Sequence, residues 1–144
     1  MQIQPYLFFD GCCERAVEFY RQALGAEVVM LMRYRDSPDP LPPGVDAATF
    51  ADRIMHVTMT IGDAVIMASD ECIGNPSTFG GFSLSLGVPD RATADRFFAA
   101  LADGGQIVMP LGKTFWSPCF GMLTDRFGVQ WMVNQDDGTT GAGE

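Results

Sequence analysis

The chain has 144 residues, 47% of them hydrophobic and 19% charged, a composition typical of one globular domain that can bury a core. Its formal net charge is −9 and its nine lysines and arginines are scattered, which argues against a nucleic-acid or anionic-membrane partner. The sequence shows no basic leader and no apolar run of about 18–20 residues, so we expect a cytoplasmic protein that does not span a membrane. The four cysteines follow no disulfide spacing, and we expect free thiols.

The first elements expected are a strand and a helix. The aromatic and branched residues 2–9 predict a strand, which Asp10 and Gly11 end. From Cys13 the apolar residues follow a helical period, and Gly25 stands where a helix C-cap belongs. The apolar face of this helix comprises Ala16, Val17, Phe19, Tyr20, Ala23 and Leu24. A second strand is expected at 26–34.

A proline-rich segment follows at residues 36–49, which contain four prolines and one glycine. Because proline lacks a backbone donor and restricts the residue before it, we predict neither a helix nor a central strand there. The segment has almost no apolar anchor, so we expect a mobile loop that acts as a lid. Strands are then expected at 54–61 and 64–69, joined by a turn at Gly62 and Asp63.

The second half repeats the order of elements seen in the first. A strand at 82–88 precedes a helix that Asp90 caps and that ends at Gly104 and Gly105. Strands are expected at 106–111, 120–124 and 129–134. The last nine residues, 136–144, have the composition of a disordered tail.

An internal repeat is the most informative feature of the sequence. Phe19-Tyr20 corresponds to Phe97-Phe98, an offset of 97 − 19 = 78 residues, and each half ends in a hairpin. We therefore predict an α/β (α+β) domain over residues 1–135, made of two βαβββ repeats whose curved mixed sheets enclose a cleft. Repeat one covers residues 1–70, a linker 71–80, and repeat two 81–135.

Several stretches of sequence resemble one known family. They are PYLFFDG, AVEFYRQALGAE, IMHVTMTIGDAVIMASDE, GFSLSL, TFW and FGMLTDRFGVQWMVN. Together they are similar to the PhnB-like branch of the vicinal oxygen chelate superfamily, which includes glyoxalase I, bleomycin-resistance proteins and extradiol dioxygenases. The resemblance implies a glyoxalase-like fold, a small-molecule ligand and a homodimer. The branch is often labelled a demethylubiquinone methyltransferase-like domain, but the chain lacks a G-x-G-x-G turn, and we expect no cofactor.

Metal-dependent members of the superfamily hold a divalent ion with side chains from four strands. The corresponding positions here fall near Gln4 or Pro5, Met67, Gly81 and Met132. Only Gln4 among them could ligate a hard or borderline cation, so we predict that the protein binds no metal.

His56 is the only histidine in the chain. Strand alternation places it with Thr58 and Thr60 on one face, opposite Met55, Val57, Met59 and Ile61, which suit the core side. It could be a structural, hydrogen-bonded histidine, a ligand contact or a general acid/base. Cys119 could be a nucleophile or a small residue that fills a turn. The same two alternatives apply to Cys12 and Cys13, whose position near a helix N-terminus favours the thiolate.

The expected pocket combines methionine and aromatic side chains with a few polar groups, a mixture typical of small-molecule sites. Its predicted lining residues are Gln4, Tyr6, Phe50, Thr58, Met67, Phe79, Ser83, Phe115, Trp116 and Met132. Three functions stay open at this point. They are a metal-independent binding protein, a metal-free enzyme with His56 as acid/base, and a structural homodimer without a ligand.

Overall fold

A computed structural model describes residues 1–71 and 78–136 of the chain. The chain divides into two compact units, Met1–Thr78 and Phe79–Glu144, and each is described by itself. Within the described residues, no helix has the length and apolar character that a membrane crossing requires.

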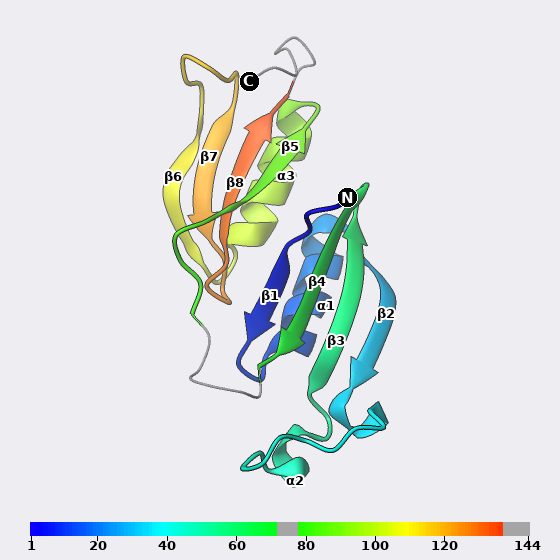
Figure 1. The fold of residues 1–144 in the computed structure, drawn as a ribbon. Helices are drawn as coiled ribbons and strands as arrows, with labels where there is room; N and C mark the ends of the chain where they lie inside the picture. Colours follow the sequence, from blue (N-terminus) through cyan, green and yellow to red (C-terminus); the bar gives the residue numbers. More distant parts are fainter. Residues whose placement is uncertain (72–77, 137–144) are drawn as a thin grey trace. The chain divides into compact units, whose positions relative to one another are not determined.

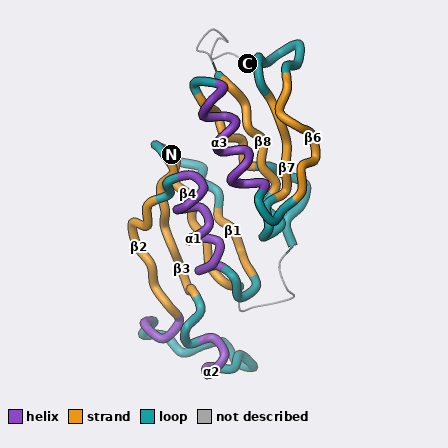
Figure 2. The backbone as a smooth tube through the Cα atoms, turned by 180° about the vertical axis from the view of Figure 1, so that it is seen from behind, coloured by secondary structure: helices purple, strands orange, loops and turns teal. Residues whose placement is uncertain are grey.

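The first unit has the order strand, helix and three strands, with two short helical turns inserted (Figure 1). Its elements are β1 (Tyr6–Phe9), α1 (Cys13–Leu24), β2 (Glu27–Arg33), η1 (Tyr34–Asp36), α2 (Ala47–Phe50), β3 (Ile54–Ile61) and β4 (Ala64–Asp70). The strands form a four-stranded mixed sheet in the order β1-β4-β3-β2, in which only β1 and β4 run parallel. Helix α1 covers one face of this sheet (Figure 2).

The second unit repeats this arrangement. Its elements are β5 (Leu84–Val88), α3 (Arg91–Ala102), β6 (Gln106–Gly112), β7 (Phe120–Thr124) and β8 (Gln130–Gln135). The sheet order is β5-β8-β7-β6, again with one parallel pair, β5 and β8, and α3 lies against one face (Figure 2). The predicted mixed α/β fold of two βαβββ repeats is therefore confirmed, whereas the predicted domain boundaries and the shared cleft stay predictions.

Both helices form where their apolar spacing and end signals place them. Helix α1 buries Cys13, Ala16, Val17, Tyr20 and Leu24 against the sheet. Gly25 adopts φ 72°, a left-handed conformation that glycine tolerates, and its N–H donates to the Arg21 carbonyl at 3.1 Å. Helix α3 starts where the Asp90 carboxylate accepts the Thr93 N–H at 2.7 Å, as predicted.

The core of each unit lies between its helix and the facing side of its sheet. In β1, in β3 from Val57 to Thr60 and in β4 from Val65 to Ala68, buried residues alternate with exposed or half-buried ones, as expected when one sheet face meets a helix. They are Leu7, Phe9, Val57, Met59, Ile66 and Ala68. In the second unit Leu123, Trp131 and Val133 face α3, and the Trp131 indole N–H donates to the buried Asp125 carboxylate at 2.9 Å.

Four sequence-based expectations about the first unit and its loops are wrong in detail. β1 begins at Tyr6 rather than at residue 2, and Tyr34 lies in a 3₁₀ turn instead of β2. The segment 36–49 contains the start of α2, because Asp46 follows the prolines and caps a helical turn by accepting from the Ala48 N–H at 3.0 Å. Met55 is only half-buried, since a β-bulge next to it shifts the pairing and buries Ile54 instead.

The predicted linker at 71–80 lies mostly outside the described residues, as does most of the predicted tail at 136–144.

Candidate functional site

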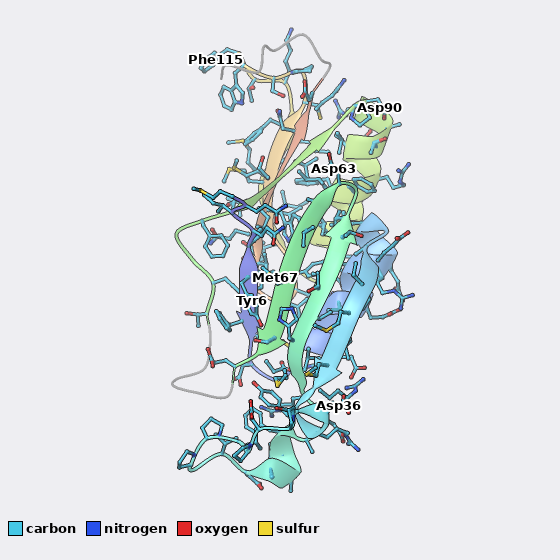
Figure 3. The ribbon with its side chains drawn as sticks, turned by 45° about the vertical axis from the view of Figure 1, so that its right-hand side comes forward. Tyr6, Asp36, Asp63, Met67, Asp90 and Phe115 are labelled. Atoms are coloured by element: carbon cyan, nitrogen blue, oxygen red, sulfur yellow. The ribbon has the colours of Figure 1, made fainter. Side chains whose placement is uncertain are left out.

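The face of the first sheet that points away from α1 gathers the side chains of interest, and we call it the open face. The strand registers place Tyr6 beside Met67, Met67 beside Thr58, and Thr58 beside Met30, so one row crosses all four strands. A neighbouring row holds Met32 beside His56. Figure 3 shows Tyr6 and Met67 close together in the middle of the sheet, with Asp63 toward one end and Asp36 toward the other.

Three polar residues of the open face form a hydrogen-bonded triad: Tyr6, His56 and Thr58. The Tyr6 hydroxyl lies 3.0 Å from His56 Nδ1, and His56 Nε2 lies 2.9 Å from Thr58 Oγ1. The Tyr6 ring also packs against the imidazole, with a centroid distance of 5.5 Å, and against Phe8 at 4.9 Å. All three members of the triad are partly buried, so they are held by the sheet and still reachable from outside.

The triad has a simple proton count. A neutral imidazole has one N–H donor and one acceptor nitrogen, whereas each hydroxyl can donate one hydrogen and also accept. Either Tyr6 donates to Nδ1 and Nε2–H donates to Thr58, or Thr58 donates to Nε2 and Nδ1–H donates to Tyr6. In both tautomers the two internal bonds use two of the three hydrogens. One hydroxyl hydrogen therefore stays available to a bound molecule.

A buried carboxylate fixes the strand that carries His56. Asp70, at the end of β4, is 1% exposed and accepts the Ile54 N–H at 2.9 Å and the Cys13 N–H at 3.0 Å. The same carboxylate thus joins the start of β3 to the first turn of α1, whose own N-cap residue, Cys12, makes no side-chain capping bond. A negative charge at a helix N-terminus is also favourable because of the helix dipole.

Gln4 lies at one edge of the open face. It lines a cavity of about 340 Å³ together with Pro5, Asp63 and Val65, and its side-chain N–H donates to the Gln2 side-chain oxygen at 3.1 Å. Pro5 adjoins Tyr6 in sequence, and Val65 is paired with Thr60 of β3. The cavity therefore lies next to the row that contains Tyr6 and Met67.

Phe50 lies at the base of the proline-rich loop rather than in the triad. Its ring contacts the Tyr34 ring edge-on at 5.7 Å, and the Arg53 guanidinium lies 4.4 Å from its centroid. Backbone hydrogen bonds from Tyr34 to Arg53 and from Arg35 to Ala51 close this base. The structure thus gives Phe50 a role in anchoring the loop.

An ion pair fastens the same region to α1. Both terminal nitrogens of Arg33 donate to the Glu14 carboxylate, at 2.6 and 3.1 Å, and lower the pKa of Glu14 below its usual range. Between these anchors, none of the residues 37–46 is buried.

In the second unit the predicted site residues fall into separate places. Ser83 lines a cavity of about 140 Å³ with Met122, Thr124 and Gln130. Met132 is paired with Met122 and Ser85 in the middle of the sheet. Phe79 contacts the Phe82 ring at 6.5 Å.

Phe115 and Trp116 occupy the tip of the β6–β7 loop, where Phe115 is 96% exposed. Their rings contact each other edge-on at 4.8 Å, and Trp116 packs on Phe120 at 5.5 Å. Backbone and side-chain bonds between Thr114 and Ser117 hold this turn. The loop meets β7 at Phe120, opposite Asn134, whereas Ser83 precedes the other end of the sheet. Ser83 and the aromatic pair therefore do not share a pocket within this unit.

The described cysteines have the surroundings of structural residues. Cys13 and Cys119 are fully buried, and burial raises the pKa of the Cys13 thiol. Burial also raises the pKa of Cys12, which outweighs the lowering effect of nearby hydrogen bonds. For Cys12 and Cys13, desolvation therefore outweighs the effect of the helix N-terminus, and of the two alternatives a small structural residue fits better than a thiolate.

Metal binding needs several converging donors. Within residues 1–71 and 78–136, no group of three or more His, Cys, Asp or Glu side chains has a geometry that could hold an ion. At the family's ligand positions, Met67 and Met132 offer thioethers and Gln4 an amide. The absence of a metal stays a prediction.

Four side chains near the triad were not predicted from the sequence. They are Phe8, Met30, Met32 and Ser69; Phe8 and Met30 are each 43% exposed, whereas Ser69 is buried. The alternation of β1 would have placed Phe8 with Tyr6, but the position of Met30 depends on a bulge in β2 between Val28 and Met30. A bulge of this kind has no clear sequence signal.

Comparisons with known proteins agree with this fold. Residues 2–133 match the model of the Glyoxalase/Bleomycin resistance protein/Dioxygenase superfamily. Protein YjdN of Escherichia coli is 35% identical over 93% of this chain and 95% of its own length. The crystal structure of protein PA1353 from Pseudomonas aeruginosa, 45% identical, covers 94% of this chain and 99% of that one with a TM-score of 0.82.

A second solved structure indicates the branch of the superfamily. It is a putative 3-demethylubiquinone-9 3-methyltransferase, PhnB protein, from Bacillus cereus, 30% identical, with a TM-score of 0.78 over 94% of this chain and 100% of that one. The predicted resemblance is confirmed, and the chain belongs to the glyoxalase/bleomycin resistance protein/dioxygenase superfamily, in its PhnB-like branch.

Proposed function

We propose that this protein binds a small molecule on the open face of its first sheet and does so without a metal ion. The observation that carries the proposal is the hydrogen-bonded triad of Tyr6, His56 and Thr58. Three polar groups from two strands converge on a partly exposed surface, and apolar side chains surround them.

The surrounding side chains support a binding role. Met30, Met32 and Met67 are flexible and polarisable, so they can adapt to the shape of a ligand. Small-molecule sites usually combine such an apolar lining with a few converging polar groups. Membership of a superfamily named after glyoxalase, bleomycin resistance protein and dioxygenase is compatible with this role.

The donor chemistry supports independence from a metal. Divalent cations of the hard and borderline classes prefer carboxylate, imidazole or thiolate ligands, and the family positions here carry the thioethers of Met67 and Met132. His56, the only imidazole in the chain, has both nitrogens within hydrogen-bonding distance of hydroxyls.

One observation favours a second candidate function, a metal-free enzyme. Because either nitrogen of His56 can carry the proton, the triad could take a proton from a substrate at one end and return one at the other. His56 would be the acid/base, and Tyr6 and Thr58 would orient its ring. We also propose a homodimer, the assembly expected from the resemblance.

Nuclear magnetic resonance tests the binding proposal directly. Since the chain has one histidine, every imidazole signal belongs to His56, and methyl-labelled methionines report the rest of the face. A library of small neutral, acidic and basic compounds should contain ligands that shift both the His56 ring and the Met30 and Met67 methyl signals. If every ligand found shifts only methionines of the second unit, such as Met122 and Met132, the proposed site is wrong.

The same compounds distinguish binding from catalysis. Each ligand is incubated with the protein and analysed by mass spectrometry for a chemical change. Turnover that is lost in His56→Ala would support the enzyme, whereas saturable binding with an unchanged ligand supports the binding protein.

A further inference from the structure

The charge of the open face limits the ligands that it can accept. Among the described residues, the side chains beside the triad on this face are Phe8, Met30, Met32, Met67 and Ser69, and none of them is a carboxylate, an ammonium or a guanidinium. A charged ligand group would lose water there and gain no ion of opposite charge, which is costly.

The arginines at the end of β2 and in the loop that follows it already have partners. Arg33 pairs with Glu14, Arg35 with Asp52, and the Arg53 guanidinium lies over the Phe50 ring. Glu27 lies at the end of β2 beside Thr60, one row beyond Thr58, so its carboxylate is on the same face but outside the rows that hold the triad. The arrangement therefore favours a ligand without a formal charge.

The number of hydrogens in the triad determines which hydrogen bond it can make to a ligand. Two of its three hydrogens are used internally, so it offers one O–H to a ligand, from Tyr6 in one tautomer of His56 and from Thr58 in the other. A ligand oxygen that accepts this hydrogen selects the tautomer. One carbonyl oxygen satisfies the triad, and its position relative to the ring decides which hydroxyl it meets.

The shape of the surroundings points to a flat ring. The open face is one side of a sheet, and it presents the Tyr6 and Phe8 rings beside methionine sulfurs. Aromatic rings stack on such rings and make favourable contacts with thioethers.

Resting on the proposed function, we infer that the ligand is an uncharged, aromatic or otherwise flat cyclic molecule whose carbonyl oxygen accepts a hydrogen bond from Tyr6 or Thr58. Its affinity comes from the apolar ring, and its orientation comes from this one bond.

Four benzene derivatives of similar size test the inference: acetophenone, benzoate, benzylammonium and ethylbenzene. Each is titrated into the full chain at neutral pH while the His56 ring nitrogens and the Met30 and Met67 methyl groups are observed. Acetophenone should bind with saturation and change the ratio of the two His56 tautomers. Benzoate and benzylammonium should bind at least about ten-fold more weakly, and ethylbenzene roughly five-fold, the factor that one net hydrogen bond supplies.

Variants test which side chains donate the inferred hydrogen bond to the carbonyl oxygen of the ligand. Tyr6→Phe and Thr58→Val each remove one hydroxyl, and the triple variant that adds His56→Phe also removes the imidazole N–H. The triple variant should bind acetophenone no more tightly than ethylbenzene, as read from the Met30 and Met67 methyl signals. Ser85→Ala, at the position of Tyr6 in the second unit, is the matched control and should keep the full preference. Because the methyl signals of Met59, Met122 and Met132, which lie outside the triad, are compared first with those of the unmodified protein, a misfolded variant is recognised before titration.

The outcomes separate the two proposals. If benzoate or benzylammonium binds as tightly as acetophenone, or if ethylbenzene does, the inferred ligand class is wrong while binding on the open face stands. If the triple variant keeps the preference for acetophenone, the inferred hydrogen bond from the triad to the carbonyl oxygen is wrong. If none of the four compounds shifts His56 or the two methionines at millimolar concentration, the inferred ligand class is wrong, and the library screen alone decides whether the open face binds a small molecule.

Discussion

Replacing Asp70 by Asn should destabilise the first unit, because the carboxylate serves two buried donors at once. One oxygen accepts the Cys13 N–H at 3.0 Å and the other accepts the Ile54 N–H at 2.9 Å, and both residues are fully buried. An asparagine side chain has one oxygen, so its NH₂ group must face one of these N–H groups. One buried donor then loses its acceptor and cannot reach water.

The expected cost follows from that count. A hydrogen bond to a charged group contributes about 1.5–3 kcal/mol, and a buried donor left without a partner costs about 1–3 kcal/mol. The two ranges describe the same loss and are not added. We therefore expect Asp70→Asn to lower the free energy of unfolding by about 2–3 kcal/mol. The His56 ring signals should shift as well, since Ile54 lies two residues before His56 on β3.

Urea denaturation measures this change. The midpoint should fall while the m-value stays constant, as expected when native contacts alone are altered. Asp63→Asn, which makes the same chemical change in an exposed turn, is the control and should stay within about 0.5 kcal/mol. A loss below 0.5 kcal/mol for Asp70→Asn would refute the argument that this carboxylate holds β3 and α1 together.

Four further predictions concern packing, mobility, assembly and metal content. Gly121→Ala should cost about 1–3 kcal/mol in urea denaturation, because its Cβ would lie 2.8 Å from the Phe98 ring and 3.1 Å from the Leu111 nitrogen. Gly87→Ala, where no atom lies within 4 Å, should cost less than about 1 kcal/mol, and equal costs would contradict the packing argument. Within the described residues, proteinase K should first cut the unburied segment 37–46, and a tight ligand should slow that cut if the loop is a lid. Protection equal to that of β3 and β4 would make the loop a packed element. Light scattering should give about twice the chain mass of 15.6 kDa, whereas 15.6 kDa at micromolar concentration would exclude the dimer. Elemental analysis of dialysed, untagged protein should find well under one ion of Ni, Zn, Fe or Mn per chain, and one full equivalent would refute metal independence.

The duplicated fold could be predicted from the sequence because its signals are local. The apolar spacing of each helix lies within about twelve residues, and Gly25 and Asp90 mark helix ends through their own backbone or side-chain preferences. The strand pairs in each hairpin are neighbours along the chain, so alternation and a short turn are sufficient to predict them.

The triad itself could not be predicted in the same way. Alternation placed His56 and Thr58 on one face, but Tyr6 is 50 residues away from His56 and meets it only because β1 inserts beside β4. The role of Asp70 depends on the same long-range arrangement. Bulges also shift the register of β2 against β3, and they change which of two adjacent residues is buried.

The two halves of the duplication differ in chemistry at equivalent positions. The two sheets have the same strand order, and each edge strand, β2 and β6, has a bulge at the equivalent place. Their registers therefore align residue by residue on the faces that point away from the helices. The equivalent pairs are Met67 with Met132, Tyr6 with Ser85, Thr58 with Met122, and His56 with Phe120.

Only the methionine is the same in both halves at these four positions. The second sheet replaces the imidazole with a phenyl ring and the threonine hydroxyl with a thioether, so it cannot form the triad. Because the scaffold is shared and the polar groups are not, the triad is not required for the βαβββ unit to fold. A set of residues that the fold does not need, on a surface that the helix does not cover, is more readily explained by a ligand than by stability.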